Sequence, residues 1–141
     1  MTNDIVNDLL PMLTQHYNVT QKPSQRSVVG LSMGGGQAIH TGMAHPEVFE
    51  WIGAFSAAAP EGILTEKHPE LATGAESKAN QKRKLFWIAC GADDSLLKRN
   101  RKFAAELNRL AIPHDFLETT GGHSWPIWRD YLPQFLEQLF H

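Results

Sequence analysis

Residues 27–36 read SVVGLSMGGG, a short apolar stretch that runs into the pattern G-x-S-x-G and then into two more glycines. A strand that turns into a helix at a serine is the setting of a nucleophile elbow, which holds the hydroxyl above the sheet. Gly30 and Gly34 lie two residues to either side of Ser32, where a Cβ is expected to crowd the turn. The backbone N–H of Met33 opens the following helix and is the candidate oxyanion donor. The pattern predicts an α/β fold with Ser32 as nucleophile, and the alternative is a glycine-rich turn without chemistry.

The overall composition is that of an ordinary globular protein. Of 141 residues, 42% are hydrophobic and 20% are charged, which suits a single domain over residues 1–141. A net charge of −2 without a long basic run argues against nucleic acid and anionic membranes as partners. The single cysteine, Cys90, excludes an internal disulfide and a cysteine-cluster metal site, and we expect it to be a buried, inert side chain.

Membrane and export signals are missing from this stretch of sequence. No apolar run reaches the roughly 18 residues that a membrane helix needs, and the first residues are polar and acidic. We therefore expect no signal peptide in this chain. The compartment stays open between the cytoplasm and secretion after removal of an upstream segment.

Apolar runs alternate with amphipathic stretches along the chain. The runs predict strands at 26–31, 49–56, 85–90 and 114–119. The amphipathic stretches predict helices at 3–17, 34–44, 96–111 and 125–140, the first of them disturbed by Pro11. Residues 57–83 are polar and irregular, with a helical piece within 69–82. This alternation indicates βαβ units and hence a mostly parallel sheet of about four strands flanked by helices.

The loops after the last two predicted strands hold an acid and a base in the order that a Ser-Asp-His triad requires. Asp93 and Asp94 follow the strand at 85–90, and His123 follows two glycines after the strand at 114–119. Loops at the carboxyl ends of parallel strands converge, so these side chains can meet Ser32. His123 would take the serine proton, and an aspartate would fix the imidazole tautomer. One of the two aspartates is also a candidate for an Asx turn or a helix cap.

Other polar and aromatic side chains rank lower as site residues. Trp125 beside His123 and Gln37 on the elbow helix are candidates for substrate contact. The remaining tryptophans are expected to pack in the core or at its rim, and they are Trp51, Trp87 and Trp128. The remaining histidines are interpreted as surface or helix residues, and they are His16, His40, His45, His68, His114 and His141. Three further acids are less well placed than Asp94, and they are Asp115, Glu118 and Asp130.

Four ordered blocks of the sequence carry a resemblance to a known family. They read GLSMGGGQA (30–38), FEWIGAFSAA (49–58), LFWIACGADDSL (85–96) and GGHSWPIWRDYL (121–132). Together they resemble the α/β-hydrolase esterases that include feruloyl and acetyl-xylan esterases, with esterase D as a more distant relative. The resemblance implies Ser32 as nucleophile, His123 as base and Asp94 as acid. It also implies hydrolysis of carboxylic esters through an acyl-enzyme, on short-chain, feruloyl or acetyl esters of plant polysaccharide, without metal or cofactor.

The chain is shorter than the domains of that family and matches their C-terminal half, so the resemblance implies a truncated α/β-hydrolase fold. The missing half normally supplies a second oxyanion donor and a neighbour for the elbow strand. An uncovered strand edge favours pairing with another chain, so we expect a homodimer or higher oligomer that covers Val28–Leu31. Two alternatives are a weak or inactive half-domain that acts as an oligomerising or binding module, and a thioesterase or acyltransferase on the same triad.

Overall fold

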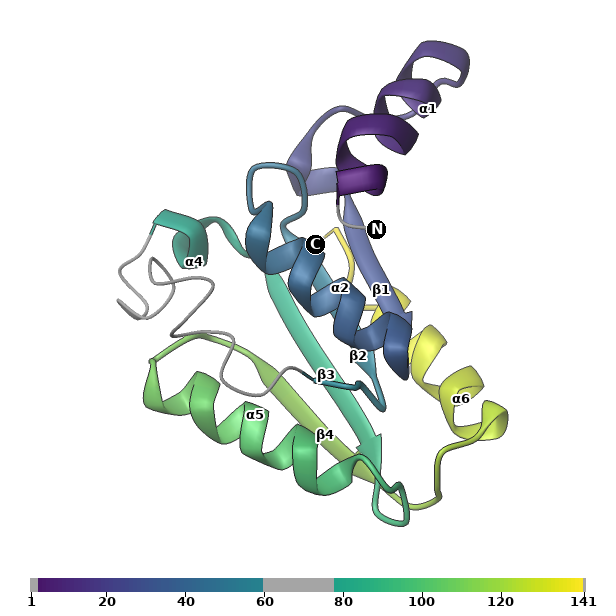
Figure 1. Ribbon diagram of the computed structural model, residues 1–141, viewed down its shortest axis with the longest axis vertical. Coiled ribbons are helices and arrows are strands. Elements are labelled where there is room, and N and C mark those ends of the chain that lie inside the picture. The colour runs from purple at the N-terminus through teal and green to yellow at the C-terminus, as the bar shows by residue number, and fades with distance from the viewer. Residues whose placement is uncertain (1–2, 60–77, 141) are drawn as a thin grey trace.

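Four parallel strands form one sheet in the order β1-β2-β3-β4 (Figure 1). The computed structural model describes residues 3–59 and 78–140. The strands are β1 (Ser27–Leu31), β2 (Trp51–Phe55), β3 (Leu85–Gly91) and β4 (Asp115–Thr119). Leu31 pairs with Phe55 and Phe55 with Ala89, so the carboxyl ends of the strands lie along one edge of the sheet. The predicted α/β fold with about four parallel strands is confirmed.

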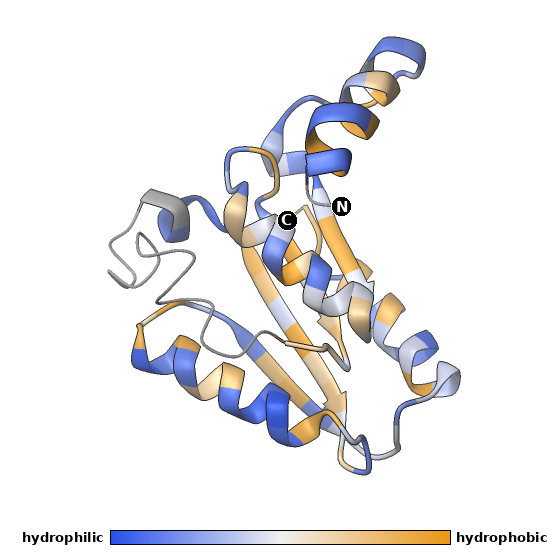
Figure 2. Ribbon diagram, viewed as in Figure 1, coloured by the Kyte–Doolittle hydropathy of each residue, from blue (hydrophilic) through white to orange (hydrophobic). Residues whose placement is uncertain are grey.

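Helices cover both faces of this sheet. Helices α2 (Met33–Ala44) and α5 (Leu97–Arg109) pack on one face, and α6 (Trp125–Leu136) packs on the other. Within the described residues β1 and β4 are the edge strands, and the central strands β2 and β3 are buried almost throughout. Figure 2 shows the resulting contrast between the hydrophobic central strands and the hydrophilic outer side of α5.

The continuous apolar runs of the central strands divide between two cores. Ile52 and Ile88 join the core under α2 and α5. Phe55 and Trp87 join the core under α6, where Phe55 meets the ring of Tyr131 edge-on at 5.7 Å. Because alternate side chains of a strand point to opposite faces, a strand covered on both sides needs apolar residues at every position. That requirement explains why these runs show no alternation of polar residues.

The N-terminal helical segment has two parts. A π-helical turn (η1, Asp4–Leu9) precedes α1 (Leu10–His16), and the N–H of Leu10 bonds to the carbonyl of Ile5. The turn ends at Leu9, two residues before Pro11, and Pro11 has no N–H with which to continue a regular α-helical ladder from the preceding residues. The predicted disturbance at Pro11 therefore takes the form of a wider turn.

Several element ends differ from the predicted ones. Helix α6 ends at Leu136 and not at residue 140, because the chain then tightens into turns in which Leu139 N–H bonds to the Leu136 carbonyl. A short 3₁₀ turn (η2, Pro23–Gln25) leads into β1. Helix α4 (Lys78–Lys82) lies within the predicted piece at 69–82, most of which lies outside the described residues. In the described part of the chain, no helix combines the length and apolarity that a membrane crossing requires.

Candidate active site

Ser32 occupies the turn between β1 and α2 in a strained backbone conformation. Its φ of 53° and ψ of −120° lie where residues other than glycine are rarely found. The end of β2 and the loop after it hold Ser32 in this conformation. Ser32 N–H donates to the Phe55 carbonyl at 2.9 Å, and Ala58 N–H donates to the Ser32 carbonyl at 2.8 Å. Strain that is fixed from both sides is typical of a functional position.

The two most crowded glycines at this turn are Gly30, which the motif predicts, and Gly36, which it does not. A Cβ on Gly30 would lie 2.2 Å from the carbonyl oxygen of Gly34, so only glycine fits there. A Cβ on Gly34 itself would meet nothing within 4 Å, and the prediction that this position is crowded is wrong. The second crowded position is Gly36, where a Cβ would lie 2.5 Å from the Ala58 carbonyl oxygen. The loop after β2, which the motif does not include, creates that requirement.

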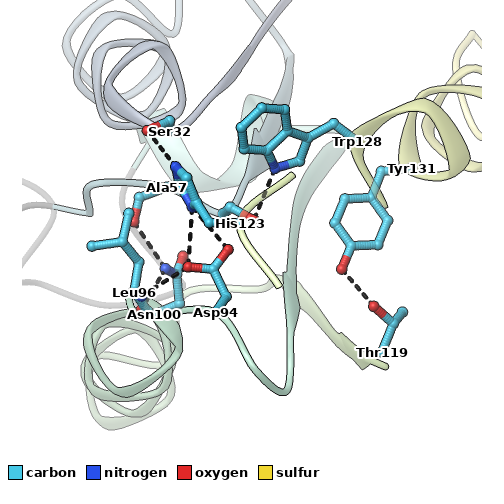
Figure 3. A network of polar contacts seen from close by, with 10 residues as sticks. Ser32, Ala57, Asp94, Leu96, Asn100, Thr119, His123, Trp128 and Tyr131 are labelled. Atoms are coloured by element: carbon cyan, nitrogen blue, oxygen red, sulfur yellow. Dashed lines mark hydrogen bonds and ion pairs between the residues drawn. The ribbon is translucent and has the colours of Figure 1, made fainter. Parts of the chain in front are cut away.

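His123 lies between Ser32 and Asp94 (Figure 3). Its Nε2 is 2.9 Å from Ser32 Oγ, and its Nδ1 is 2.9 Å and 3.1 Å from the two carboxylate oxygens of Asp94. The histidine loop approaches the end of β3 closely, because a Cβ on Gly91 would lie 2.1 Å from the Gly121 carbonyl oxygen. Gly121 has φ +94°, which suits glycine. These two glycines let the loop return over the sheet.

Asp94 is buried, with no exposed side-chain area. The N–H of Leu96 donates to Oδ1 at 2.8 Å, Nδ1 of His123 donates to the carboxylate, and the Ser56 hydroxyl lies close enough to lower the pKa of Asp94. Burial, the largest influence, would raise the pKa of Asp94, but these hydrogen bonds together hold that pKa below its usual value. The bond from Leu96 N–H closes an Asx turn just before α5. Asp94 therefore both accepts a hydrogen bond from His123 and forms the Asx turn, two roles that the sequence could not assign to one aspartate. Its neighbour Asp93 is exposed.

Two residues of this network were not among the predicted site residues. The indole N–H of Trp128 donates to Ser56 Oγ at 3.0 Å, and the indole ring meets the His123 ring edge-on at 4.9 Å. Trp128 was expected only to pack, and Ser56 received no role. The available signal was its place directly after β2, which matches the place of Ser32 directly after β1.

The other predicted site residues are Met33, Trp125 and Gln37, and they differ in how they relate to the triad. Met33 begins α2, so its N–H has no partner within the helix and lies next to Ser32. Trp125 is 65% exposed, and its ring packs edge-on against Trp128 at 5.6 Å. Gln37 lines a groove of about 140 Å³ on the α2 side of β1, and the described residues that line this groove include none of the triad.

The remaining histidines lie outside the triad. His45 bonds to Glu47 and His114 to the Ile112 carbonyl, while His16 and His40 lie on helices. His68 and His141 lie outside the described residues. Within residues 3–59 and 78–140, no group of three or more His, Cys, Asp or Glu side chains could hold a metal ion.

Comparison with known families identifies the type of protein. The model of the family described as "Putative esterase" matches residues 2–139. The chain belongs to this esterase family. Among characterised relatives of this esterase-family chain is an acetyl esterase of Caldicellulosiruptor saccharolyticus, 24% identical over 164 residues that cover 93% of the chain and 60% of that protein.

Solved structures agree with the family. A ferulic acid esterase superposes on 94% of the esterase-family chain with a TM-score of 0.76 and 26% identity, and the match covers 57% of that enzyme. A ferulic acid esterase of Anaeromyces mucronatus superposes on 99% of the chain with a TM-score of 0.79 and 21% identity, over 53% of its own length. The chain thus spans little more than half the length of these proteins.

Proposed function

We propose that the chain is a serine hydrolase of carboxylic esters that works through an acyl-enzyme. The observation that carries the proposal is the continuous hydrogen-bonded series from Ser32 Oγ through the His123 ring to the Asp94 carboxylate. A carboxylate only accepts hydrogen bonds, so Nδ1 of His123 carries a proton and Nε2 faces Ser32 as acceptor. That tautomer is the one a general base requires.

The reaction follows from this arrangement. Ser32 Oγ attacks the ester carbonyl while His123 Nε2 takes the hydroxyl proton, and Asp94 stabilises the imidazolium. The Met33 N–H and the N-terminal end of α2 face the oxyanion that forms. The imidazolium then protonates the leaving alkoxide, which leaves an acyl-serine. Water attacks that acyl group with His123 again as base, which releases the carboxylic acid and restores the serine.

For the substrate we propose short-chain, feruloyl or acetyl esters of plant polysaccharide, offered as small molecules or oligosaccharides. The names of the similar proteins, an acetyl esterase and ferulic acid esterases, support this class. An apolar groove of about 230 Å³ adjoins the triad through Leu31 and Trp128, and Trp125 forms part of its wall. Such a groove suits an acyl chain or an aromatic ring.

A second candidate is a half-domain with weak activity that acts by self-association. The observation that favours it is the edge position of β1, where Val29 is 39% exposed. Val29 and Gly30 line apolar grooves on both faces of the sheet. A strand added to this edge would fill both grooves with its alternate side chains. Among the described residues Met33 is the oxyanion donor we identify, and lack of a second donor typically slows such a reaction ~10²–10³-fold.

Two measurements on the same variants separate the candidates. We would measure hydrolysis of p-nitrophenyl acetate and methyl ferulate, and covalent labelling by a fluorophosphonate, for wild type, Ser32→Ala and Ser27→Ala. Ser27 begins the same strand and serves as matched control. The esterase proposal expects Ser32→Ala to lose at least ~10³-fold in rate and all labelling, with Ser27→Ala unchanged. Labelling at Ser32 without turnover favours the half-domain. The absence of both labelling and turnover would refute an activated serine.

A further inference from the structure

Ser56 is a buried serine near the triad with a positive φ, as Ser32 has. It follows β2 directly, is fully buried and has φ 45°, a conformation rarely adopted by side chains other than glycine, asparagine and aspartate. Its N–H donates to the Ala89 carbonyl at 2.7 Å. A buried polar residue in strained backbone, outside the Ser-His-Asp set, calls for a physical role.

The direction of each hydrogen bond at Ser56 follows from the donors around it. The indole N–H of Trp128 can only donate, so Ser56 Oγ accepts that bond, and its own proton is free for another acceptor. The neighbouring acceptors are the carboxylate of Asp94 and the sulfur of Cys90. Cys90 is buried, and burial, with the nearby charge of Asp94, raises the pKa of its thiol to about 12. A charged carboxylate is a far stronger acceptor than a neutral thiol.

We infer that Ser56 is a positioning residue, which takes a hydrogen bond from Trp128 and gives one to Asp94, and so holds the carboxylate toward Nδ1 of His123. Trp128 also restrains His123, since the indole and imidazole rings pack in a T-shaped arrangement. Helix α6 and the end of β2 therefore act together on the contact between Asp94 and His123. The catalytic part of this inference rests on the proposed esterase function, whereas the hydrogen-bond series itself does not.

The proton on Nδ1 of His123 reports this role directly. In the ¹⁵N-labelled chain of residues 1–141, its resonance is expected far downfield, and exchange with water is expected to be slow. Ser56→Ala and Ser56→Gly both remove the hydroxyl, but only glycine also relieves the strain at φ 45°. In both variants we expect the resonance to move upfield and to exchange about tenfold faster or more. The Trp128 indole N–H should shift as well, because it loses its acceptor.

The indole N–H of Trp51 is an internal control in the same spectra. It donates to the Ser24 carbonyl at 2.9 Å, at the far end of β2 from Ser56, and we expect it to exchange through opening of the fold that does not depend on Ser56. The inference requires this signal to keep its exchange rate in both variants. It is overturned when the His123 proton is unaffected, when Trp51 accelerates equally, or when only one of the two variants shows the change.

Kinetics give a second readout where the chain hydrolyses esters. Ser56→Ala should lower kcat about 10- to 100-fold and leave KM within about twofold, because the contact it weakens is needed in the reaction step. Trp128→Phe keeps a ring beside His123 and loses only the N–H, so a smaller fall is expected. A loss carried by KM alone refutes the positioning role. Complete absence of turnover in wild type refutes the esterase proposal, and the His123 proton still decides the role of Ser56.

Discussion

Replacement of Asp94 by asparagine tests the proposed acid with the smallest change of shape. The carboxylate is fully buried and accepts hydrogen bonds from His123 and Leu96. An amide of the same size has one acceptor oxygen and one NH₂ group, which only donates. When its oxygen keeps the Leu96 bond, the NH₂ group faces a donor. Asp93→Asn is the matched control, because that exposed neighbour loses the same charge one residue away.

The size of the effect follows from the imidazole tautomer. Facing an NH₂ group, Nδ1 of His123 has to become the acceptor, which puts the ring proton on Nε2, 2.9 Å from Ser32 Oγ. A protonated Nε2 cannot take the serine proton. In serine proteases the same exchange lowers kcat by about 10⁴, which corresponds to about 5.5 kcal/mol at 1.36 kcal/mol per factor of ten. The unsatisfied donor should also lower the free energy of unfolding by about 1–3 kcal/mol.

The assay compares initial rates of ester hydrolysis and of fluorophosphonate labelling at pH 7 for wild type, Asp94→Asn and Asp93→Asn. Thermal unfolding of each variant shows whether it is folded at the assay temperature. We expect Asp94→Asn to lose about 10³–10⁴-fold in both rates and Asp93→Asn to stay within about threefold. An Asp94→Asn variant within tenfold of wild type, or an equal loss in Asp93→Asn, would refute the assignment of the acid.

Three further predictions concern packing, acid stability and the sheet edge. Gly91→Ala places a Cβ against the Gly121 carbonyl oxygen, 2.1 Å away before relaxation. We expect the free energy of unfolding measured in urea to fall by about 1–3 kcal/mol and the contact between His123 and Ser32 to be lost. Unchanged stability would contradict this prediction. The lowered pKa of Asp94 means that its stabilising effect is present above the ordinary value of 3.8 and lost as pH falls through the folded-state pKa. Wild type should therefore lose more stability than Asp94→Asn as the pH is lowered from 3.8 through the folded-state pKa, which acid titration followed by circular dichroism measures. For residues 1–141 in isolation we expect self-association through β1 by light scattering, with Val29→Lys shifting the chain toward monomer; a monodisperse wild-type monomer at micromolar concentration rules this out.

The order of the elements could be predicted because each depends on neighbours in sequence. The strands of the sheet show as apolar runs, and α5 shows as an amphipathic stretch that ends before Pro113. The C-terminal end of α6 was less predictable, because a helix end depends on which carbonyls the following turn can reach. Local patterns thus determine where elements lie better than where they stop.

The site divides in the same way. Ser32 and His123 lie in glycine-rich loops whose type is visible in the sequence, and the structure brings them within hydrogen-bond distance. The crowding at Gly36 depends on a carbonyl at position 58, and the role inferred for Ser56 depends on an indole 72 residues later. Such contacts join segments that only the folded sheet brings together, so position along the chain can point to Ser56 but cannot show which residues it contacts.

One backbone rule nevertheless links the parts of the site. The residue that follows each of the first two strands donates its N–H to the next strand, from Ser32 to Phe55 and from Ser56 to Ala89. Ala92, just after β3, does the same toward Thr119. Parallel pairing in this even register sets the exits of three strands in one row along the carboxyl edge.

Both serines in that row turn out of the sheet with positive φ, 53° and 45°, so their hydroxyls leave the strands in related backbone conformations. The fourth loop then has to cross back over the row, because His123 follows the last strand and contacts a residue that follows the first. A short loop can make that crossing only with a reversed turn at Gly121, where φ is +94°. The nucleophile and the Ser56 hydroxyl therefore share one origin in strand register, whereas the acid and the base depend on the loops that follow β3 and β4.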